Sequence, residues 1–177
     1  MLLSEIINKD IKPIKVLESN TQITGIDYDS RRIKEGMIFA AIQGDRINGI
    51  EFCDRAIQAG AKAILCNKRD SKKIFSKNIN ILTSHNVRLS TSLITKKFFP
   101  NQPKNLAAIT GTNGKTSIAF YLSKIWKILN FKGASIGTLG IRYGNKHIQT
   151  KLTTPDLISL IKNLDFLKQK KIENVVI

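Results

Sequence analysis

In this chain of 177 residues, the residue types best suited to carry out chemistry occur in one glycine-rich segment, Gly111-Thr112-Asn113-Gly114-Lys115-Thr116. An apolar stretch at residues 105–110 precedes it, and an amphipathic stretch at residues 115–129 follows it. A glycine-rich turn between a strand and a helix is the setting in which backbone N–H groups cradle phosphate groups. The segment therefore predicts a phosphate-binding loop of the short pattern GxxGK[ST], with an ordinary glycine turn as the alternative.

Each residue type in this loop suits a step of nucleotide chemistry. The glycines permit positive φ angles and close approach of the backbone to a ligand. Lys115 is expected to reach the β and γ phosphates of ATP, and Thr116 is expected to offer its hydroxyl to Mg²⁺. We therefore predict Lys115 and Thr116 as the catalytic pair, with Thr116 as the metal-contacting residue.

Alternating strand and helix patterns occupy the first hundred residues. We expect strands at residues 22–27, 36–42, 62–66 and 78–83, and helices at residues 2–8, 51–59 and 87–99. Gly60 is placed to end the helix at residues 51–59. This order predicts an α/β fold with a mostly parallel sheet.

A proline pair marks the predicted domain boundary. Pro100 and Pro103 interrupt the helical pattern just before a new apolar strand, which places the boundary near residue 102. We interpret residues 1–101 as a small α/β domain and residues 102–177 as the first part of a phosphate-loop domain with a mostly parallel sheet.

The second domain repeats the alternation. After the loop and its helix we expect a strand at residues 134–136, a hairpin around Tyr143-Gly144-Asn145, a helix at residues 155–170 and a strand at residues 174–177. Function in open α/β sheets lies beyond the carboxyl ends of strands, and the sequence stops at such an end. We therefore expect an incomplete domain.

The charge balance suggests an anionic partner without choosing among them. Lys and Arg number 29 against 13 Asp and Glu, for a net charge of +16. Residues 101–177 hold 12 of the basic residues and 3 of the acidic ones. The absence of a long basic tract favours a solvated surface over a nucleic-acid site, but a basic nucleic-acid-binding protein remains an alternative of a different class.

Several other classes of protein are disfavoured. No apolar run reaches the roughly 18 residues that a membrane span needs, so we expect a cytoplasmic protein without membrane contact. Cys53 and Cys66 lack the spacing of a metal site or a disulfide framework, and are expected to be buried thiols. His85 and His147 are isolated and are interpreted as surface residues.

Ordered motifs along nearly the whole chain resemble the Mur ligase family, and its MurE type in particular. They are, in chain order, Asp29-Ser30-Arg31, GMIFAAIQG at residues 36–44, Asn48-Gly49, Ala56 with GAKA at residues 60–63, the loop at residues 111–116 and LTTPD at residues 152–156. The resemblance implies an ATP- and Mg²⁺-dependent ligase of peptidoglycan precursor synthesis, and a chain that is an incomplete, inactive part of it.

The implied reaction adds the third amino acid to UDP-MurNAc-L-Ala-D-Glu through an acyl phosphate. Its partners would be this UDP-MurNAc-dipeptide and a free amino acid, either diaminopimelate, the commoner choice in such relatives, or lysine. The implied protein is a monomer without a specific nucleic-acid partner. A MurF-type ligase, a folylpolyglutamate synthetase-like enzyme and a noncatalytic UDP-sugar-binding piece are the alternatives within this resemblance.

The resemblance also assigns residues, some of which have a purely structural alternative. It assigns ATP binding to Gly111, Thr112, Asn113, Gly114, Lys115, Thr116 and Ser117. It assigns uridine binding to Tyr28, Ser30, Asp45, Arg46 and Ile47, and muramoyl-peptide binding to Leu152, Thr153 and Thr154. Leu152 stands where several relatives have Asn. Ser30 could instead cap a turn, Arg46 could be a surface charge, and residues 153–156 could form a helix cap with Pro155 at the first helical position.

Overall fold

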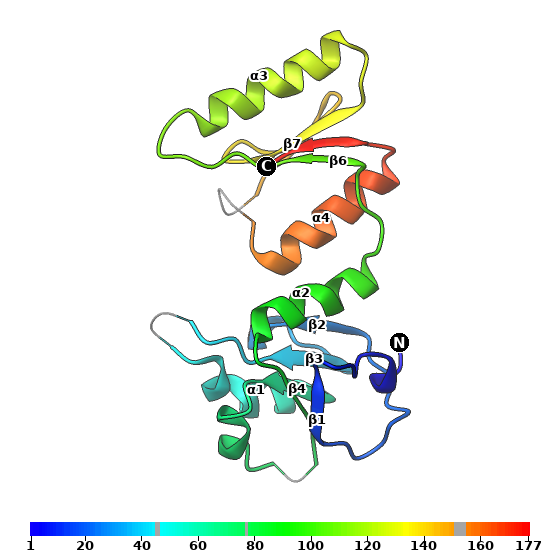
Figure 1. Ribbon diagram of the computed structural model, residues 1–177, viewed down its shortest axis with the longest axis vertical. Helices are drawn as coiled ribbons and strands as arrows, with labels where there is room; N and C mark the ends of the chain where they lie inside the picture. The colour runs from blue at the N-terminus through cyan, green and yellow to red at the C-terminus, as the bar shows by residue number, and fades with distance from the viewer. Residues whose placement is uncertain (45–46, 77, 151–154) are drawn as a thin grey trace. The chain divides into compact units, whose positions relative to one another are not determined.

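A computed structural model of the chain describes residues 1–44, 47–76, 78–150 and 155–177 (Figure 1). The backbone forms two compact units, Met1–Phe98 and Phe99–Ile177. The division falls just before Pro100, close to the position that the proline pair indicates.

The Met1–Phe98 unit contains a five-stranded sheet in the order β1-β5-β4-β3-β2. The strands are β1 Lys12–Lys15, β2 Gly25–Asp27, β3 Met37–Ala40, β4 Ala63–Cys66 and β5 Asn80–Thr83. Strands β2 to β5 pair in parallel, as the sequence predicts, while β1 pairs antiparallel with β5. The sequence analysis missed β1, because this edge strand is mostly exposed and contains Pro13, so it lacks an apolar pattern.

Helices cover both faces of this sheet. They are α1 Cys53–Gln58 and α2 Val87–Phe98, with 3-10 turns at Leu3–Glu5, Ser30–Arg32, Gly49–Phe52 and Asp70–Lys73. Successive residues of β3 enter two different cores: Ile38 packs with α2, and Phe39 packs with α1. The continuous apolar run at residues 36–42 is therefore the pattern of a strand buried on both faces.

Two predicted features of this unit have clear outcomes. The helix expected at residues 2–8 is only a single 3-10 turn, Leu3–Glu5. Gly60 follows the end of α1 with a φ of +97°, and a Cβ there would lie 2.8 Å from the Cα of Glu35. The prediction that Gly60 ends this helix is confirmed, because both the backbone conformation and the close approach require glycine.

The Phe99–Ile177 unit contains a mixed sheet in the order β6-β10-β7-β8-β9. The strands are β6 Asn105–Ala107, β7 Gly133–Gly137, β8 Gly140–Tyr143, β9 Lys146–Ile148 and β10 Asn174–Val176. Strands β6, β10 and β7 are parallel, and the β8–β9 hairpin adds antiparallel strands at one edge. The hairpin predicted around Gly144 is confirmed, and this glycine has a φ of +55°.

Helices α3 Lys115–Ile128 and α4 Leu157–Gln169 lie on opposite faces of this sheet (Figure 1). Helix α4 buries Ile158, Leu164 and Leu167. Helix α3 has no buried residue, although Trp126 lies directly over Gly133 of β7, where a Cβ would come within 2.6 Å of the indole. Only the absence of a side chain at Gly133 lets α3 approach the sheet this closely.

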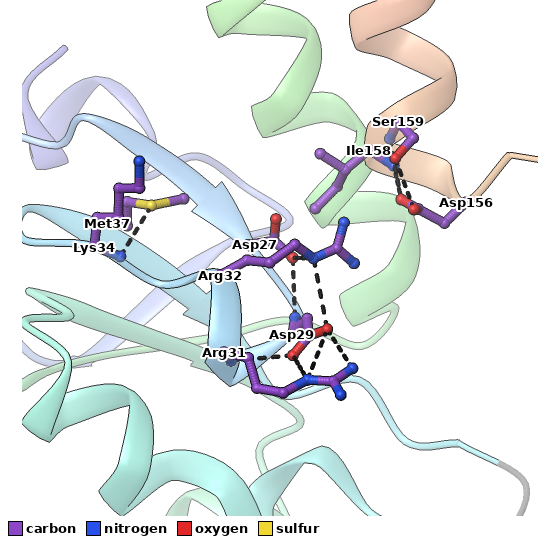
Figure 2. A network of polar contacts seen from close by, with 9 residues as sticks. All are labelled: Asp27, Asp29, Arg31, Arg32, Lys34, Met37, Asp156, Ile158 and Ser159. Carbon is purple, nitrogen blue, oxygen red and sulfur yellow. Dashed lines mark hydrogen bonds and ion pairs between the residues drawn. The ribbon is translucent and has the colours of Figure 1, made fainter. Parts of the chain in front are cut away.

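The start of α4 differs from the predicted cap. Pro155 precedes the helix, and Asp156 is the N-cap. Its Oδ1 accepts hydrogen bonds from the backbone N–H groups of Ile158 at 3.1 Å and Ser159 at 3.0 Å (Figure 2). Asp156 thus pairs two of the backbone N–H groups that a helix N-terminus leaves without an intrahelical partner, and Pro155 lies before the helix.

Candidate functional site

The phosphate loop lies between β6 and α3, at the carboxyl end of a parallel strand. The pairing of β6 with β10 continues beyond Ala107, since the N–H of Ile109 donates to the carbonyl of Ile177 at 2.8 Å. Gly111 and Gly114 have φ angles of +147° and +77°. No atom lies within 4 Å of the position that a Cβ of Gly114 would occupy, so the backbone conformation rather than crowding calls for glycine there.

Helix α3 begins directly at this loop. Gly114 is its N-cap and offers no side chain to the N–H groups of the first turn. A helix N-terminus without a side-chain cap carries partial positive charge and N–H donors that suit a phosphate group. All of the loop residues from Gly111 to Ser117 are exposed.

The side chain of Lys115 folds back over the loop. Its Nζ donates to the carbonyl oxygen of Gly111 and, at 3.2 Å, to that of Thr112. The ammonium is therefore held beside the N–H groups of α3 by two backbone carbonyls. This arrangement fits a polyphosphate, whose oxygens can accept hydrogen bonds from the N–H groups and from the ammonium together.

Thr116 faces a residue that the sequence analysis missed. Its Oγ1 lies 3.4 Å from the Oγ1 of Thr138, which follows the carboxyl end of β7. Both residues line one cavity, together with Lys115 and with Arg142 of β8. The available signal for Thr138 was its position after an apolar strand, where polar residues of α/β sheets contact ligands.

The cavity offers few groups to a metal ion. Hydroxyls such as that of Thr116 suit Mg²⁺, which keeps several waters and binds phosphate oxygens rather than requiring a cage of carboxylates. In the described parts of the chain, no three His, Cys, Asp or Glu side chains come together as a metal site. The chain's own contribution to a Mg²⁺ site would thus be the Thr116 hydroxyl.

In the other unit, the turn after β2 carries two predicted uridine contacts, Tyr28 and Ser30. Asp29, and not Ser30, caps the 3-10 turn Ser30–Arg32, because its Oδ1 accepts the N–H of Arg31 at 3.0 Å. Ser30 is buried. The capping alternative for Ser30 is therefore wrong, and its hydroxyl is not used in that role.

A polar network fixes this turn (Figure 2). Asp27 is only 2% exposed, and its Oδ1 accepts the backbone N–H of Asp29 at 2.9 Å. The Nε of Arg32 lies 3.5 Å from Asp27 Oδ1 and 3.6 Å from Asp29 Oδ2. The Arg32 guanidinium also lies 5.4 Å from the centre of the Tyr28 ring. We call residues 27–32 the aspartate turn.

Asp29 also makes a two-point contact with Arg31. Arg31 donates from Nε to Asp29 Oδ1 at 2.9 Å and from Nη2 to Oδ2 at 2.8 Å. This hydrogen bonding lowers the pKa of Asp29 to about 2 and raises the pKa of Arg31. Asp29 therefore carries its negative charge at any physiological pH.

The remaining predicted residues are distributed as follows. Ile47 is exposed, and its carbonyl accepts the N–H of Gly44 at 3.1 Å. Asp45, Arg46, Leu152, Thr153 and Thr154 lie outside the described residues. The structure therefore places Tyr28 and Ser30 together on one turn, and it places the residues predicted to bind ATP together on the phosphate loop.

The two cysteines are buried free thiols, as predicted. Burial raises the pKa of both Cys53 and Cys66 to about 12. His85 and His147 are exposed, also as predicted. Across the described ranges, the longest apolar helices fall short of what crossing a membrane requires.

Two family descriptions match the sequence. Residues 22–95 match "Mur ligase family, catalytic domain", and residues 109–177 match "Mur ligase middle domain". The first match contains the aspartate turn, and the second contains the phosphate loop.

Curated relatives extend the match along the chain. The UDP-N-acetylmuramoyl-L-alanyl-D-glutamate--2,6-diaminopimelate ligase of Bradyrhizobium diazoefficiens is 34% identical over 176 residues, which cover 99% of this chain and 35% of the relative. The ligase of the same name from Zymomonas mobilis is 35% identical over 159 residues, which cover 90% of this chain and 32% of the relative. The chain spans about a third of the length of these relatives.

Solved structures share the fold. A structure of a UDP-N-acetylmuramoyl-L-alanyl-D-glutamate--2,6-diaminopimelate ligase matches 99% of this chain with a TM-score of 0.75 and 22% identity, over 35% of its own length. The structure of the MurF ligase of Thermotoga maritima in complex with ADP matches 88% of this chain with a TM-score of 0.54 and 22% identity, over 31% of its own length. Both the sequence of each unit and the shared fold lead to the same conclusion: the chain belongs to the Mur ligase family.

Proposed function

We propose that this chain is part of a cytoplasmic ligase that adds meso-diaminopimelate to UDP-MurNAc-L-Ala-D-Glu in peptidoglycan synthesis. The observation that carries the proposal is the GxxGK[ST] loop between β6 and α3, with its uncapped helix N-terminus and its lysine. The printed names of the relatives support the substrate and the added amino acid. Lysine as the added amino acid, or a MurF-type reaction, are the nearest alternatives.

The Phe99–Ile177 unit would bind ATP with Mg²⁺. Bound ATP would supply the phosphoryl group that activates the D-glutamyl carboxylate as an acyl phosphate, with Mg²⁺ offsetting the charge on the phosphate oxygens. The first-turn N–H groups of α3 would hold the phosphates, and Lys115 would exchange its two loop carbonyls for phosphate oxygens. Thr116 would provide the hydroxyl ligand, and Gly111, Thr112, Asn113, Gly114 and Ser117 would complete the loop.

The Met1–Phe98 unit would bind the uridine nucleotide. Tyr28 and Ser30 are the proposed contacts, and the aspartate turn holds both of them in place. Asp45, Arg46 and Ile47 are proposed to contact the same nucleotide, and Leu152, Thr153 and Thr154 to contact the muramoyl peptide. We propose that the protein works as a monomer.

ATP binding is the part of this reaction that the chain's own residues support, and it can be tested directly. We expect Lys115→Ala to weaken Mg²⁺-ATP binding roughly 10- to 150-fold, the value of a hydrogen bond to a charged group. Calorimetric titration of the 177-residue chain would measure it. Lys170→Ala is the matched control, because Lys170 is an exposed lysine of the same unit that contacts Phe166 instead.

The control is expected to bind ATP like the unchanged chain. Equal affinity of Lys115→Ala and the unchanged chain would mean that residues 111–116 form only a turn. An equal loss in the control would mean that ATP responds to overall positive charge rather than to the loop.

A further inference from the structure

A basic hollow in the Phe99–Ile177 unit takes no part in the proposed reaction. It lies between the C-terminal half of α3, the segment that follows it, and the β8–β9 hairpin. We define the basic hollow by its cationic lining, Lys124, Lys127, Lys132, Arg142 and Lys146. These are five of the 12 Lys and Arg residues in residues 101–177.

The charges of the basic hollow lack acidic partners. Its lining contains no Asp or Glu. The three carboxylates of this unit act elsewhere: Asp156 caps α4, Asp165 accepts from Asn101 and Gln169, and Glu173 pairs with Lys168. Within the described residues 99–150 and 155–177, Lys168–Glu173 is the only ion pair.

The arrangement of the cations suits one compact anion. Lys124 and Lys127 lie three residues apart on α3, so both project on one side of the helix, and Arg142 and Lys146 come from the hairpin opposite. A concave wall of like charge focuses the electrostatic potential and raises the local concentration of anions. A hollow cannot lie flush against a flat bilayer, which favours a discrete ligand over a membrane surface.

The donors indicate phosphate chemistry. Lysine ammonium groups are strong donors to phosphate oxygens, and the guanidinium of an arginine such as Arg142 can bind them in a two-point contact. Several cations around one hollow match an anion with several charges better than a single carboxylate. Arg142 also lines the cavity beside Lys115 and Thr116, so the two anion-binding regions share one side chain.

We propose that the basic hollow is a second anion site that binds a multiply charged polyphosphate, separate from the phosphate loop. The probe is inorganic tripolyphosphate, titrated calorimetrically into the 177-residue chain carrying Lys115→Ala. That background weakens anion binding at the phosphate loop, so tripolyphosphate bound there contributes less to the titration. We expect saturable binding of one equivalent, with an affinity that falls as salt is raised.

Two further variants in this background locate the site. Lys127→Gln with Lys132→Gln should weaken tripolyphosphate at least about tenfold, because two charged donors are lost. Lys162→Gln with Lys170→Gln removes the same charge from α4 and should change the affinity less than about twofold. Thermal unfolding of each variant would verify that it is folded.

Three results would overturn the proposal. They are the absence of saturable binding in the Lys115→Ala chain, an equal loss in the α4 control pair, and binding of a single-stranded oligonucleotide through the hollow without binding of tripolyphosphate. The last result would instead identify a nucleic-acid site. None of them bears on ATP binding at the phosphate loop, which is tested with Mg²⁺-ATP by comparing the unchanged chain with Lys115→Ala.

Discussion

The aspartate turn and the phosphate loop, the two regions proposed to bind nucleotides, are held together by opposite means. In the aspartate turn, the side chain of the buried Asp27 accepts a hydrogen bond from the backbone of Asp29, and Arg32 lies beside both carboxylates. In the phosphate loop, every residue is exposed and Lys115 binds only backbone carbonyls of its own loop. One region is ordered by its own charges, whereas the other keeps its charge available for a ligand.

This difference separates stability from binding. Changes in the aspartate turn should lower the free energy of unfolding as well as ligand affinity, because its polar groups are buried or paired. Changes in the phosphate loop should lower ligand affinity with little effect on folding. The predictions below test that separation.

The largest effect on stability is expected for Asp27→Ala. The change leaves the N–H of Asp29 without its acceptor and removes one of the carboxylates beside Arg32, which should cost about 1–3 kcal/mol of the free energy of unfolding. Asp27→Asn keeps an acceptor oxygen and should cost less. Denaturant unfolding followed by circular dichroism would compare them. Equal stability of all three chains would show that the network does not order the turn.

A change of similar size, measured as ATP affinity, is expected for Gly114→Ala. The φ of +77° costs a non-glycine residue about 1–2 kcal/mol, although the added methyl group meets no atom. The exposed loop can relieve this strain by changing its conformation, and ATP affinity should then fall roughly 5- to 30-fold, because binding has to restore the strained conformation. Gly144→Ala, at a φ of +55° in the β8–β9 turn with equal open space, is the matched control. A similar loss of ATP affinity in both variants would contradict a local role for Gly114.

The smallest effect concerns the charge of Asp29. Its pKa is lowered from 3.8 to about 2, so its pairing stabilises the folded chain fully above pH 3.8, and this contribution is lost as the pH falls through about 2. Because Arg31 is 72% exposed, the gain should be only about 0.2–1 kcal/mol. A carboxyl titration by NMR should show the pKa of Asp29 rise toward 3.8 in Arg31→Gln. An unchanged pKa would exclude Arg31 as its main cause.

The sequence predicted one of the two regions far better than the other. The phosphate loop is contiguous, and each residue acts through a local property: glycine conformation, a helix N-terminus, a lysine one position later. The network of the aspartate turn depends on which polar side chains face inward, so Asp27 and Arg32 carried no signal. Thr138 and Arg142 join the phosphate-loop cavity only through the pairing of β7 with β8, which is a tertiary contact.

The same distinction applies to the fold. Buried parallel strands such as β3 and β4 stand out as apolar runs, and Gly60 stands out as a helix end. The exposed edge strand β1 has no such pattern, because only pairing with β5 makes it a strand. Helix α4 begins at Leu157, so its cap is Asp156 and Pro155 lies before the helix.

We propose that the two units bind two different nucleotides at independent sites. The most direct measurement is a pair of calorimetric titrations, with Mg²⁺-ATP and with UDP-MurNAc-L-Ala-D-Glu, on the 177-residue chain carrying Lys115→Ala or Ser30→Ala. We predict that Lys115→Ala weakens only ATP binding and that Ser30→Ala weakens only binding of the UDP-sugar peptide. Loss of UDP-sugar affinity in Lys115→Ala as severe as its loss of ATP affinity would contradict the division into two sites.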